Sequence, residues 1–553
     1  MSRPRTRRKL VVLSALALVV AVAFGLTPLP SHDGATRAAA RAGRAAAHRA
    51  RPPAPSLPPL AATASVASAR GALTVPESYL GVSTEYWALP LFYRHVRLFE
   101  RALALIHAQG NGPLSVRIGG DSADHTFWDP MARNMPHWVF KLTPAWLNPT
   151  AELVRRLGVR LILDLNLVTG SPIRAAEWAQ AAERVMPRGS IAAFEIGNEP
   201  DIYSRWFWLA TVSRTTLGAT LLPTGLTADS YAQVFRAYST ALAQVAPHVP
   251  LIGPAVANPA LDVNWISGLI DSSHPGLSTV SAHRYPLSAC ATRASRAYPT
   301  IARVLGEPAS AGIADTLAPA IALAHRADLP FRLTELNSVT CGGRPGVSDT
   351  FATALWAPDA LFELLSAGVD GVNVHVRANT INAAFALSRN GFIARPLLYG
   401  LILFVRTLGP GAQLVPVSVH EPQAAHLKVW AVRVRGGTLR VLLLNKGNRS
   451  VRVQLALPAS GSARVQRLLA ASAAARWGVT LNGQRLGHDG AWHGRAATET
   501  IAPGPHGYVL VVPRMSGALI DLALRQPALP SDAPRPPALR SDAPRPPALP
   551  HRV

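Results

Sequence analysis

The stretch Phe194–Asp201, FEIGNEPD, joins an apolar, strand-like segment to a cluster of polar residues. The strand is expected to end near Gly197, since glycine and the proline that follows three residues later both interrupt regular pairing. Asn198 and Glu199 follow at once. A short apolar strand that ends in an amide and a carboxylate is typical of a parallel sheet whose strand ends carry the reactive groups.

Seven further apolar segments of the same kind occur along the chain. Helix-like segments such as NPTAELVRRLG (148–158) and SYAQVFRAYSTALAQVA (230–246) separate them. Eight strand–helix units predict an α/β fold, a (β/α)8 or TIM barrel, rather than an open sheet. The expected strands are Tyr79–Thr84, Leu114–Ile118, Arg160–Asn166, Ala192–Gly197, Val249–Gly253, Val280–Tyr285, Phe331–Glu335 and Gly371–Val376.

From about residue 410 the pattern changes to short strands separated by turns that contain Gly or Asn. The segments HLKVWAVRV (426–434), GTLRVLLLN (437–445) and SVRVQLAL (450–457) either alternate or run apolar without a helical period. This pattern of short strands and turns predicts a β-sandwich rather than a ninth strand–helix unit. We therefore expect a barrel over residues 71–409 and a smaller β-sandwich domain over residues 410–515.

The two ends of the chain do not suit a folded core. Five basic residues precede the apolar run Leu10–Leu26, which predicts a signal peptide or a membrane anchor within residues 1–30. Residues 31–70, rich in Ala, Arg and Pro, are expected to be a linker. Residues 516–553 hold a Pro-rich ten-residue repeat that starts at Pro527 and are expected to be a disordered tail. We predict an exported or cell-surface protein, with membrane contact only through an uncleaved N-terminal segment.

The composition limits the partners. The chain has 553 residues, of which 49% are hydrophobic, and a formal net charge of +24. Eleven basic residues and one Asp lie within residues 1–70, and no nucleic-acid-binding motif accompanies them, so the charge does not predict a nucleic-acid partner. The histidines lack HExxH or similar paired spacing, so no metal or cofactor is expected. The oligomeric state is left open.

Polar residues of several predicted strands should meet at one face of the barrel, because the carboxyl ends of its strands all point the same way. Glu195 lies on the opposite side of its strand from Ile196 and is a candidate partner for Arg117. The residues expected at the face itself are Glu85, Arg117, Asp121, Asn198, Glu199, His283, Tyr285 and Glu335.

Two carboxylates on facing strands suit cleavage of a glycosidic bond. One group protonates the leaving oxygen and the other acts at the anomeric carbon. A separation of about 5–5.5 Å allows a covalent intermediate with retention of configuration, whereas about 6.5–9.5 Å leaves room for a water molecule and gives inversion. Glu199 and Glu335 are the candidates for this pair, and Asn198 could bind a sugar hydroxyl beside them.

Four motifs in the correct order resemble glycoside hydrolase family 79, the heparanase and β-glucuronidase family within the retaining glycosidases of clan A. They are SVRIGGDSADHTFWDP (Ser115–Pro130), FEIGNEPD (Phe194–Asp201), LTELNSVTCGGRPGVSDTFA (Leu333–Ala352) and RPLLYGLILFVRTLG (Arg395–Gly409). The resemblance covers roughly residues 72–515. It implies that Glu199 is the acid/base, that Glu335 is the nucleophile, and that the substrate is a β-linked glucuronide.

The family commonly holds the glucuronate carboxylate on backbone N–H groups of the loop after the nucleophile, with tyrosine hydroxyls nearby. By that resemblance the N–H groups of Cys341, Gly342 and Gly343 could form an anion-binding nest. The usual tyrosine is absent, and Thr340 stands in its place. Arg377, just beyond strand eight, could pair with the carboxylate instead, or form a structural salt bridge at the rim.

The only two cysteines, Cys290 and Cys341, follow strands six and seven, which are neighbours in the predicted barrel. In an exported protein they could form a disulfide, and the alternative is two unrelated buried thiols. Two other functions stay open: a clan A glycosidase for a neutral sugar, and a non-catalytic carbohydrate-binding surface protein. His283 and Tyr285 could hold Glu335 in place, although His283 could equally fill the barrel.

Overall fold

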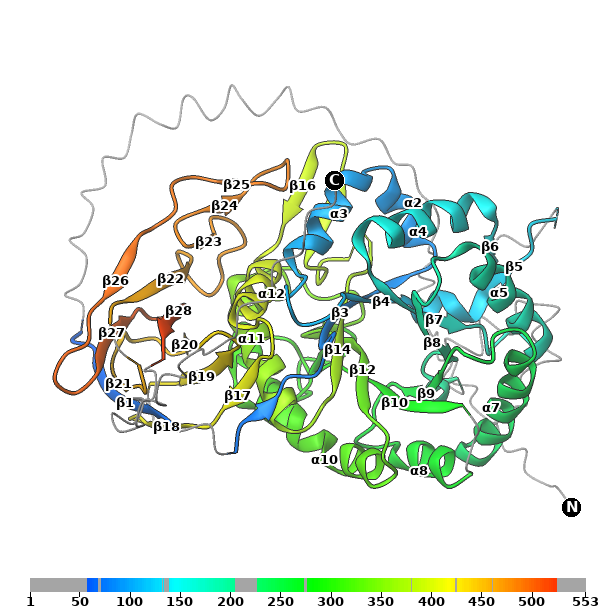
Figure 1. The fold of residues 1–553 in the computed structure, drawn as a ribbon, viewed down its shortest axis with the longest axis horizontal. Coiled ribbons are helices and arrows are strands. Elements are labelled where there is room, and N and C mark those ends of the chain that lie inside the picture. Colours follow the sequence, from blue (N-terminus) through cyan, green and yellow to red (C-terminus); the bar gives the residue numbers. More distant parts are fainter. Residues whose placement is uncertain are drawn as a thin grey trace, which may run out of the picture. The chain divides into compact units, whose positions relative to one another are not determined.

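The computed structural model describes most of the chain between residues 57 and 524 (Figure 1). The described residues are 57–67, 71–131, 133, 139–203, 226–272, 276–378, 380–422, 425–459 and 461–524. The apolar run Leu10–Leu26 and the repeats from Pro527 lie outside them. Among the described helices, none combines the length and the apolar character needed to cross a membrane.

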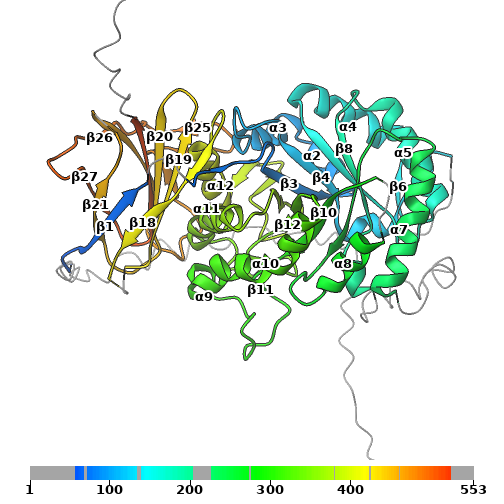
Figure 2. The same cartoon turned by 60° about the horizontal axis from the view of Figure 1, so that its bottom comes forward.

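Eight parallel strands close into a barrel in chain order, with the last strand pairing with the first (Figures 1 and 2). Each strand overlaps its predicted range, so the TIM barrel is confirmed, and the ends shift by only a few residues. The strands are β3 (Leu80–Glu85), β4 (Ser115–Gly119), β7 (Arg160–Leu165), β8 (Ile191–Ile196), β9 (Leu251–Val256), β10 (Leu277–Arg284), β12 (Phe331–Leu336) and β14 (Gly371–His375).

Helices cover the outside of the barrel, and local sequence signals fix several of their ends. Helix α4 starts at Pro144 and ends at Leu157, and Gly158, with a φ of 61°, forms its left-handed cap. Helix α5 starts after Ser171, whose side chain accepts a hydrogen bond from the backbone N–H of Arg174. The helices are α2 (Ala88–Tyr93), α3 (Val96–Leu105), α4 (Pro144–Leu157), α5 (Pro172–Val185), α7 (Ala228–Ala243), α8 (Val263–Asp271), α9 (Ile301–Leu305), α10 (Ala311–Arg326), α11 (Phe351–Ser366) and α12 (Pro396–Thr407).

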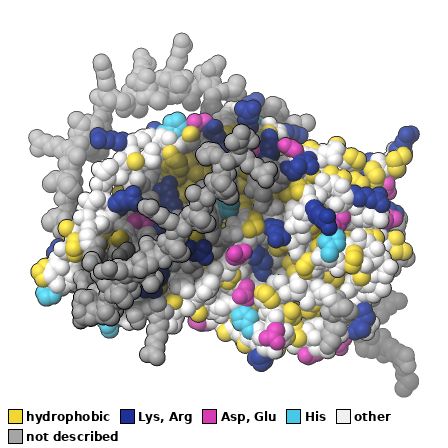
Figure 3. Space-filling view, viewed as in Figure 1, with side chains coloured by type: hydrophobic (Ala, Val, Ile, Leu, Met, Phe, Trp, Pro, Cys, Tyr) yellow, Lys and Arg dark blue, Asp and Glu magenta, His cyan; other side chains and the backbone are white. Residues whose placement is uncertain are grey.

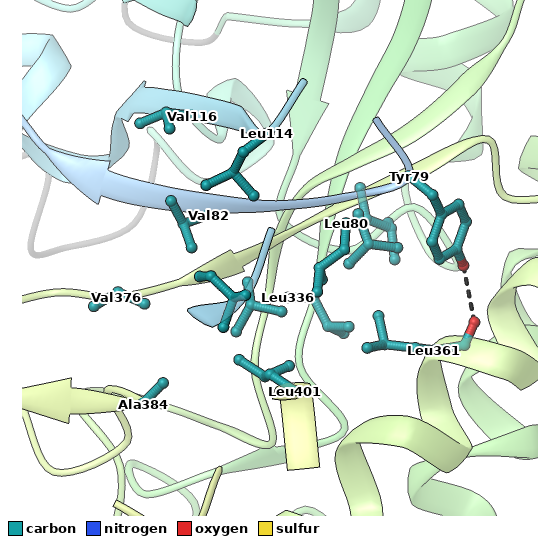
Figure 4. Close-up of a cluster of buried hydrophobic side chains, with 14 of the residues drawn as sticks. Tyr79, Leu80, Val82, Leu114, Val116, Leu336, Leu361, Val376, Ala384 and Leu401 are labelled. Carbon is teal, nitrogen blue, oxygen red and sulfur yellow. Dashed lines mark hydrogen bonds between the residues drawn. The ribbon is translucent and has the colours of Figure 1, made fainter. Parts of the chain in front are cut away.

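Helices α11 and α12 are buried along most of their length, because they pack against each other, the barrel and the β-sandwich. Figure 4 shows Leu361 of α11 and Leu401 of α12 in one cluster with strand residues Leu80 and Leu336. The Tyr79 hydroxyl donates to the carbonyl of Leu361 at 2.9 Å. An apolar surface on all sides of a helix is stable only when such layers cover it.

Residues beyond the barrel form two sheets that share a core. One sheet has the order β18–β1–β21–β27 and the other the order β2–β17–β19–β20–β28–β22–β23. Alternate residues face the core, as in β21, where buried and less buried positions alternate. The strands are β1 (Leu60–Val66), β2 (Leu73–Thr74), β17 (Gln413–Val415), β18 (Val417–His420), β19 (Leu427–Val434), β20 (Thr438–Asn445), β21 (Val451–Ala456), β22 (Ala463–Leu469), β23 (Thr480–Leu481), β26 (Glu499–Ile501), β27 (Tyr508–Val512) and β28 (Ser516–Ala523).

Two predicted boundaries are wrong. Residues 60–66, expected in the linker, form β1, which pairs with β18 and β21 and points Ala62 and Ala64 into the sandwich core. Residues 516–523, expected in the tail, form β28 between β20 and β22. Both errors have the same cause. The two segments are short, with small or alternating apolar side chains, and were assigned to the Pro-rich sequence beside them although they pair with strands of the sandwich.

Basic side chains do not gather in one stripe on the described surface of Figure 3. In that view the Lys and Arg side chains are dispersed among uncharged groups. A nucleic-acid-binding face normally concentrates positive charge along one path. The described basic side chains on the face shown in Figure 3 form no such path.

Candidate active site

The carboxylates of Glu199 and Glu335 meet at the carboxyl ends of the barrel strands. Glu335 lies in β12, and Glu199 follows β8 across the barrel mouth. One carboxylate oxygen of each, together with a ring nitrogen of His283 from β10, all lie within 4.8 Å of one another. The short gap is the arrangement that a double-displacement reaction requires.

Glu335 is held on both oxygens by groups from other strands. Nη1 of Arg117 donates to Oε1 at 2.7 Å, and the hydroxyl of Tyr285 donates to Oε2 at 2.8 Å. Nδ1 of His375 lies 3.5 Å from Oε1. Burial disfavours the charged form, but His375, His283 and Arg117, with the Tyr285 hydroxyl, outweigh it and hold the pKa of Glu335 well below its usual range. Glu335 is therefore ionised at neutral pH, and hydrogen bonds fix both of its oxygens.

Arg117 is the fully buried centre of this network. Nε donates to Glu195 at 2.7 Å and Nη2 donates to Asp164 at 2.8 Å and to Oδ1 of Asn198 at 3.0 Å. The contact between Glu195 and Arg117 is the one suggested by the sequence. Burial opposes the positive charge of Arg117, but Glu195, Asp164 and Glu335 outweigh this effect and raise its pKa. Asn198 thus has its acceptor oxygen committed, while its Nδ2 makes no hydrogen bond within the described residues.

Glu199 sits in a turn with unusual backbone geometry. Its φ is 52°, in the left-handed region that a non-glycine residue rarely adopts. Its N–H donates to the carbonyl of Ala255 at 3.1 Å, and Oε1 lies 2.9 Å from Nδ1 of His283. Burial lowers the pKa of His283, but Glu335 and the hydrogen bond with Glu199 outweigh it, so the pKa of His283 is raised. His283 contacts Glu199 directly, whereas Tyr285 holds Glu335.

Glu85, Asp121 and Arg377 form one side of the barrel mouth. Glu85 is buried and accepts the N–H of Ser122 at 2.9 Å. Nε of Arg377 lies 3.6 Å from Glu85, and Nη1 lies 3.6 Å from Asp121. The guanidinium also lies over the Trp87 ring, 5.6 Å from its centroid. Both charge contacts are longer than a hydrogen bond, so the donors of Arg377 are not saturated.

The loop after the predicted nucleophile differs from the expected nest of three amides. Cys341, Gly342 and Gly343 all have positive φ, which bends the chain tightly, and the N–H of Gly343 donates to the carbonyl of Thr340 at 3.3 Å. That donor is therefore used within the turn. Cys341 forms a disulfide with Cys290, and beside it β11 (Leu287–Ser288) pairs with β13 (Val339–Thr340). The loops after strands six and seven are thus joined next to Glu335.

Several residues of the site were not anticipated from the sequence. His375 is the last residue of β14 and the last but one of predicted strand eight, so its place near a strand end was an available signal. Asp164 lies inside an apolar strand, and only the barrel closure shows that it meets Arg117. Asp124 and Tyr203 lie outside the strands, and nothing in the linear pattern connects them.

The group formed by Glu199, His283 and Glu335 could also hold a metal ion on geometric grounds alone. However, the carboxylate oxygens already have side-chain hydrogen-bond partners. Arg117 and Tyr285 bind Glu335, and His283 binds Glu199. A protonated His283 is a donor and cannot be a ligand at the same nitrogen. These contacts favour a pair of working carboxylates over a metal centre.

Comparison with solved structures gives the same architecture over most of the chain. A 4-O-α-L-rhamnosyl-β-D-glucuronidase from Fusarium oxysporum 12S superimposes with a TM-score of 0.67 and 18% identity, covering 83% of this chain and 100% of that one. This chain has a glycoside hydrolase fold. A family 51 arabinofuranosidase from Xanthomonas axonopodis pv. citri gives a TM-score of 0.61 at 16% identity, covering 84% of this chain and 100% of that one.

Sequence comparison gives a match over a smaller part of the chain. No family model matches the chain. A β-glucuronidase from Aspergillus niger is 23% identical over 361 residues, which cover 56% of this chain. The match spans 60% of the length of that curated relative. The chain is therefore similar to a β-glucuronidase in sequence and to several glycosidases in fold, and its substrate must be argued from its own residues.

Proposed function

We propose that this protein is a retaining glycoside hydrolase that cleaves β-linked glucuronides. The observation that carries the proposal is the carboxylate pair of Glu199 and Glu335, whose oxygens approach within 4.8 Å at the mouth of the barrel. This short separation favours double displacement over attack by a water molecule placed between the groups.

The environments of the two carboxylates suggest their roles. Glu335, ionised and held by Arg117 and Tyr285, attacks the anomeric carbon and forms a glycosyl ester while the glycosidic bond breaks. Glu199 gives its proton to the departing oxygen. In the second step Glu199 removes a proton from water, the water oxygen bonds to the anomeric carbon, and the bond to Glu335 breaks. Each carboxylate thereby returns to its starting state.

The preference for a uronic acid is supported by Arg377 and by the two glucuronidases among the similar proteins. Arg377 lies at the mouth of the site with unsaturated donors, and a guanidinium can bind a carboxylate through two parallel hydrogen bonds. Replacing it in Arg377→Ala should lower kcat/KM for an aryl glucuronide about 10- to 100-fold while changing the matching glucoside by less than about threefold. If kcat/KM fell by the same factor for the glucuronide and the glucoside, Arg377 would not be the residue that binds the carboxylate.

A neutral sugar is the second candidate, and one observation favours it. Arg377 is flanked by Glu85 and Asp121, so its charge is partly compensated before any substrate arrives. These two carboxylates could accept hydrogen bonds from sugar hydroxyls instead. A panel of nitrophenyl glycosides that includes glucuronide, glucoside, xyloside and arabinofuranoside separates the two candidates.

The central experiment tests the two carboxylates. Glu335→Gln should abolish turnover, and a 2-fluoro-glycoside with a good leaving group should label Glu335 covalently in the wild type, seen as one added glycosyl mass on its peptide. In Glu199→Gln the same reagent should still label Glu335, but the variant should no longer hydrolyse substrates with poor leaving groups. Unchanged activity in both variants would remove the two carboxylates from the proposal, whereas a wild type that binds carbohydrate but hydrolyses no glycoside of the panel would favour a carbohydrate-binding protein without catalysis.

Export and membership of glycoside hydrolase family 79 belong to the same proposal. The Cys290–Cys341 disulfide supports export, since such bonds persist in oxidising compartments. The basic, apolar N-terminus supports it as well. N-terminal sequencing of the protein from culture medium and from the membrane fraction would distinguish cleavage from anchoring.

A further inference from the structure

The turn that carries Glu199 needs external support. Glu199 has a φ of 52°, and such a conformation in a non-glycine residue costs free energy unless the surroundings impose it. The hydrogen bond from its N–H to Ala255 holds one side of the turn against β9. The other side is held by a residue that no motif of the sequence pointed to.

That residue is Tyr203. Its hydroxyl accepts the backbone N–H of Asn198 at 3.2 Å and donates to the carboxyl group of Asp124, at 2.9 and 3.0 Å from the two oxygens. Asp124 in turn accepts the N–H groups of Leu167 and Val168 at 3.2 and 3.3 Å. The Glu199 turn is therefore linked through one hydroxyl to the loops that follow strands β4 and β7.

All three members of this link are buried. Asn198 and Asp124 are each 1% exposed and Tyr203 is 3% exposed, so water cannot replace a lost hydrogen bond easily. Burial and the adjacent Asp124 raise the pKa of Tyr203 well above its ordinary value. The phenol keeps its proton and remains a donor at every pH at which the enzyme would work.

We propose that Tyr203, held by Asp124, is a positioning residue for the acid/base Glu199. The inference rests on the proposed function. Asn198 and Glu199 share a peptide bond, so fixing the N–H of Asn198 fixes the start of the Glu199 backbone. Glu335 is held by Arg117 and Tyr285, and of these two only Arg117 also contacts the turn, through Oδ1 of Asn198. Arg117 is fixed by Glu195 and Asp164 as well, so a loosened turn should impair proton donation more than nucleophilic attack.

This difference can be measured through the leaving group. A dinitrophenolate departs without a proton, whereas a phenolate needs one, so only the second reports on Glu199 in the bond-breaking step. With aryl glycosides of the sugar that the panel identifies, Tyr203→Phe should lower kcat/KM for the phenyl glycoside about tenfold or more, since small misplacements of catalytic groups are costly. The dinitrophenyl glycoside should change by less than about threefold.

Tyr79→Phe is the matched control. It also removes one buried tyrosine hydroxyl hydrogen bond, to the carbonyl of Leu361 at 2.9 Å (Figure 4), but Tyr79 precedes β3 at the opposite end of the barrel. It should lower Tm by a similar amount and leave the ratio of the two substrates unchanged. If Tyr203→Phe folds poorly, Asp124→Asn tests the same link and should shift the ratio in the same direction.

An equal fall for both leaving groups, or no fall for either, would overturn the positioning role. A wild type that hydrolyses neither aryl glycoside would instead overturn the proposed function. The two failures are therefore distinguishable in one set of assays.

Discussion

Nη1 of Arg117 donates to Oε1 of Glu335 at 2.7 Å, and the same guanidinium contacts two further carboxylates that are completely buried. The guanidinium therefore orients the proposed nucleophile and also compensates the negative charges of Asp164 and Glu195. Because an arginine presents several donors in one fixed plane, the three carboxylates are placed at fixed angles to one another. The proposed nucleophile is thus part of a barrel strand and not of a loop.

Arg117→Lys should show that this geometry matters more than charge. A lysine keeps the positive charge but cannot reach three carboxylates in one plane, so we expect kcat to fall about 100-fold or more and stability to fall by about 3–5 kcal/mol. Steady-state kinetics and urea unfolding measure the two effects. Arg155→Lys, at the exposed pair with Glu152 on α4, is the control and should change stability by less than about 0.5 kcal/mol.

The raised pKa of His283 predicts a pH dependence of stability. Its protonated form is favoured in the folded state, so its contribution is fully present below the unfolded value of about 6.5 and is lost as pH rises through the folded pKa. The Tm of the wild type should therefore decline more steeply above about pH 6.5 than that of His283→Gln. Calorimetric scans in a series of buffers measure both slopes, and parallel curves would contradict the assigned protonation.

The disulfide between Cys290 and Cys341 should stabilise the loops beside Glu335. It closes a long segment, with a sequence separation of 51 residues, and removing it is expected to cost about 2–4 kcal/mol. Reductant should lower the urea midpoint of the wild type to that of the Cys290→Ser/Cys341→Ser variant, and should leave the variant unaffected. Two free thiols in the protein purified without reductant, seen by mass after alkylation, would refute the pairing.

The barrel and the β-sandwich should unfold together because a buried ion pair joins them. Nζ of Lys446 lies 2.7 Å from Oδ2 of Asp359 in α11, and both side chains are almost inaccessible to water. Lys446→Met would leave the carboxylate unpaired and should cost about 3–5 kcal/mol, whereas Lys446→Met/Asp359→Leu should recover most of that loss. Thermal unfolding followed by fluorescence and by circular dichroism measures the stability of each variant and shows whether the two signals change in one transition. A double variant no more stable than the single one would contradict the expectation.

Prediction from the sequence succeeded where the signal was local. Each of the eight barrel strands is a short apolar run bounded by glycine, proline or polar residues, and this pattern survives any uncertainty about the rest of the fold. The failures at β1 and β28 are of another kind. Their side chains are too small or too close to Pro-rich sequence to stand out, and they become strands because each pairs with a neighbouring strand on both sides.

The site shows the same division. By itself the sequence determined the order of the barrel strands and the two glutamates at strand ends, because period and position along one strand depend only on neighbouring residues. Only the tertiary structure decided that Arg117 joins Asp164 and Glu335 in addition to the expected Glu195, that His375 faces Glu335, and that Tyr203 reaches Asp124. Those contacts form between strands or loops far apart in the chain, so their distances are set by barrel closure and core packing, which no local pattern encodes.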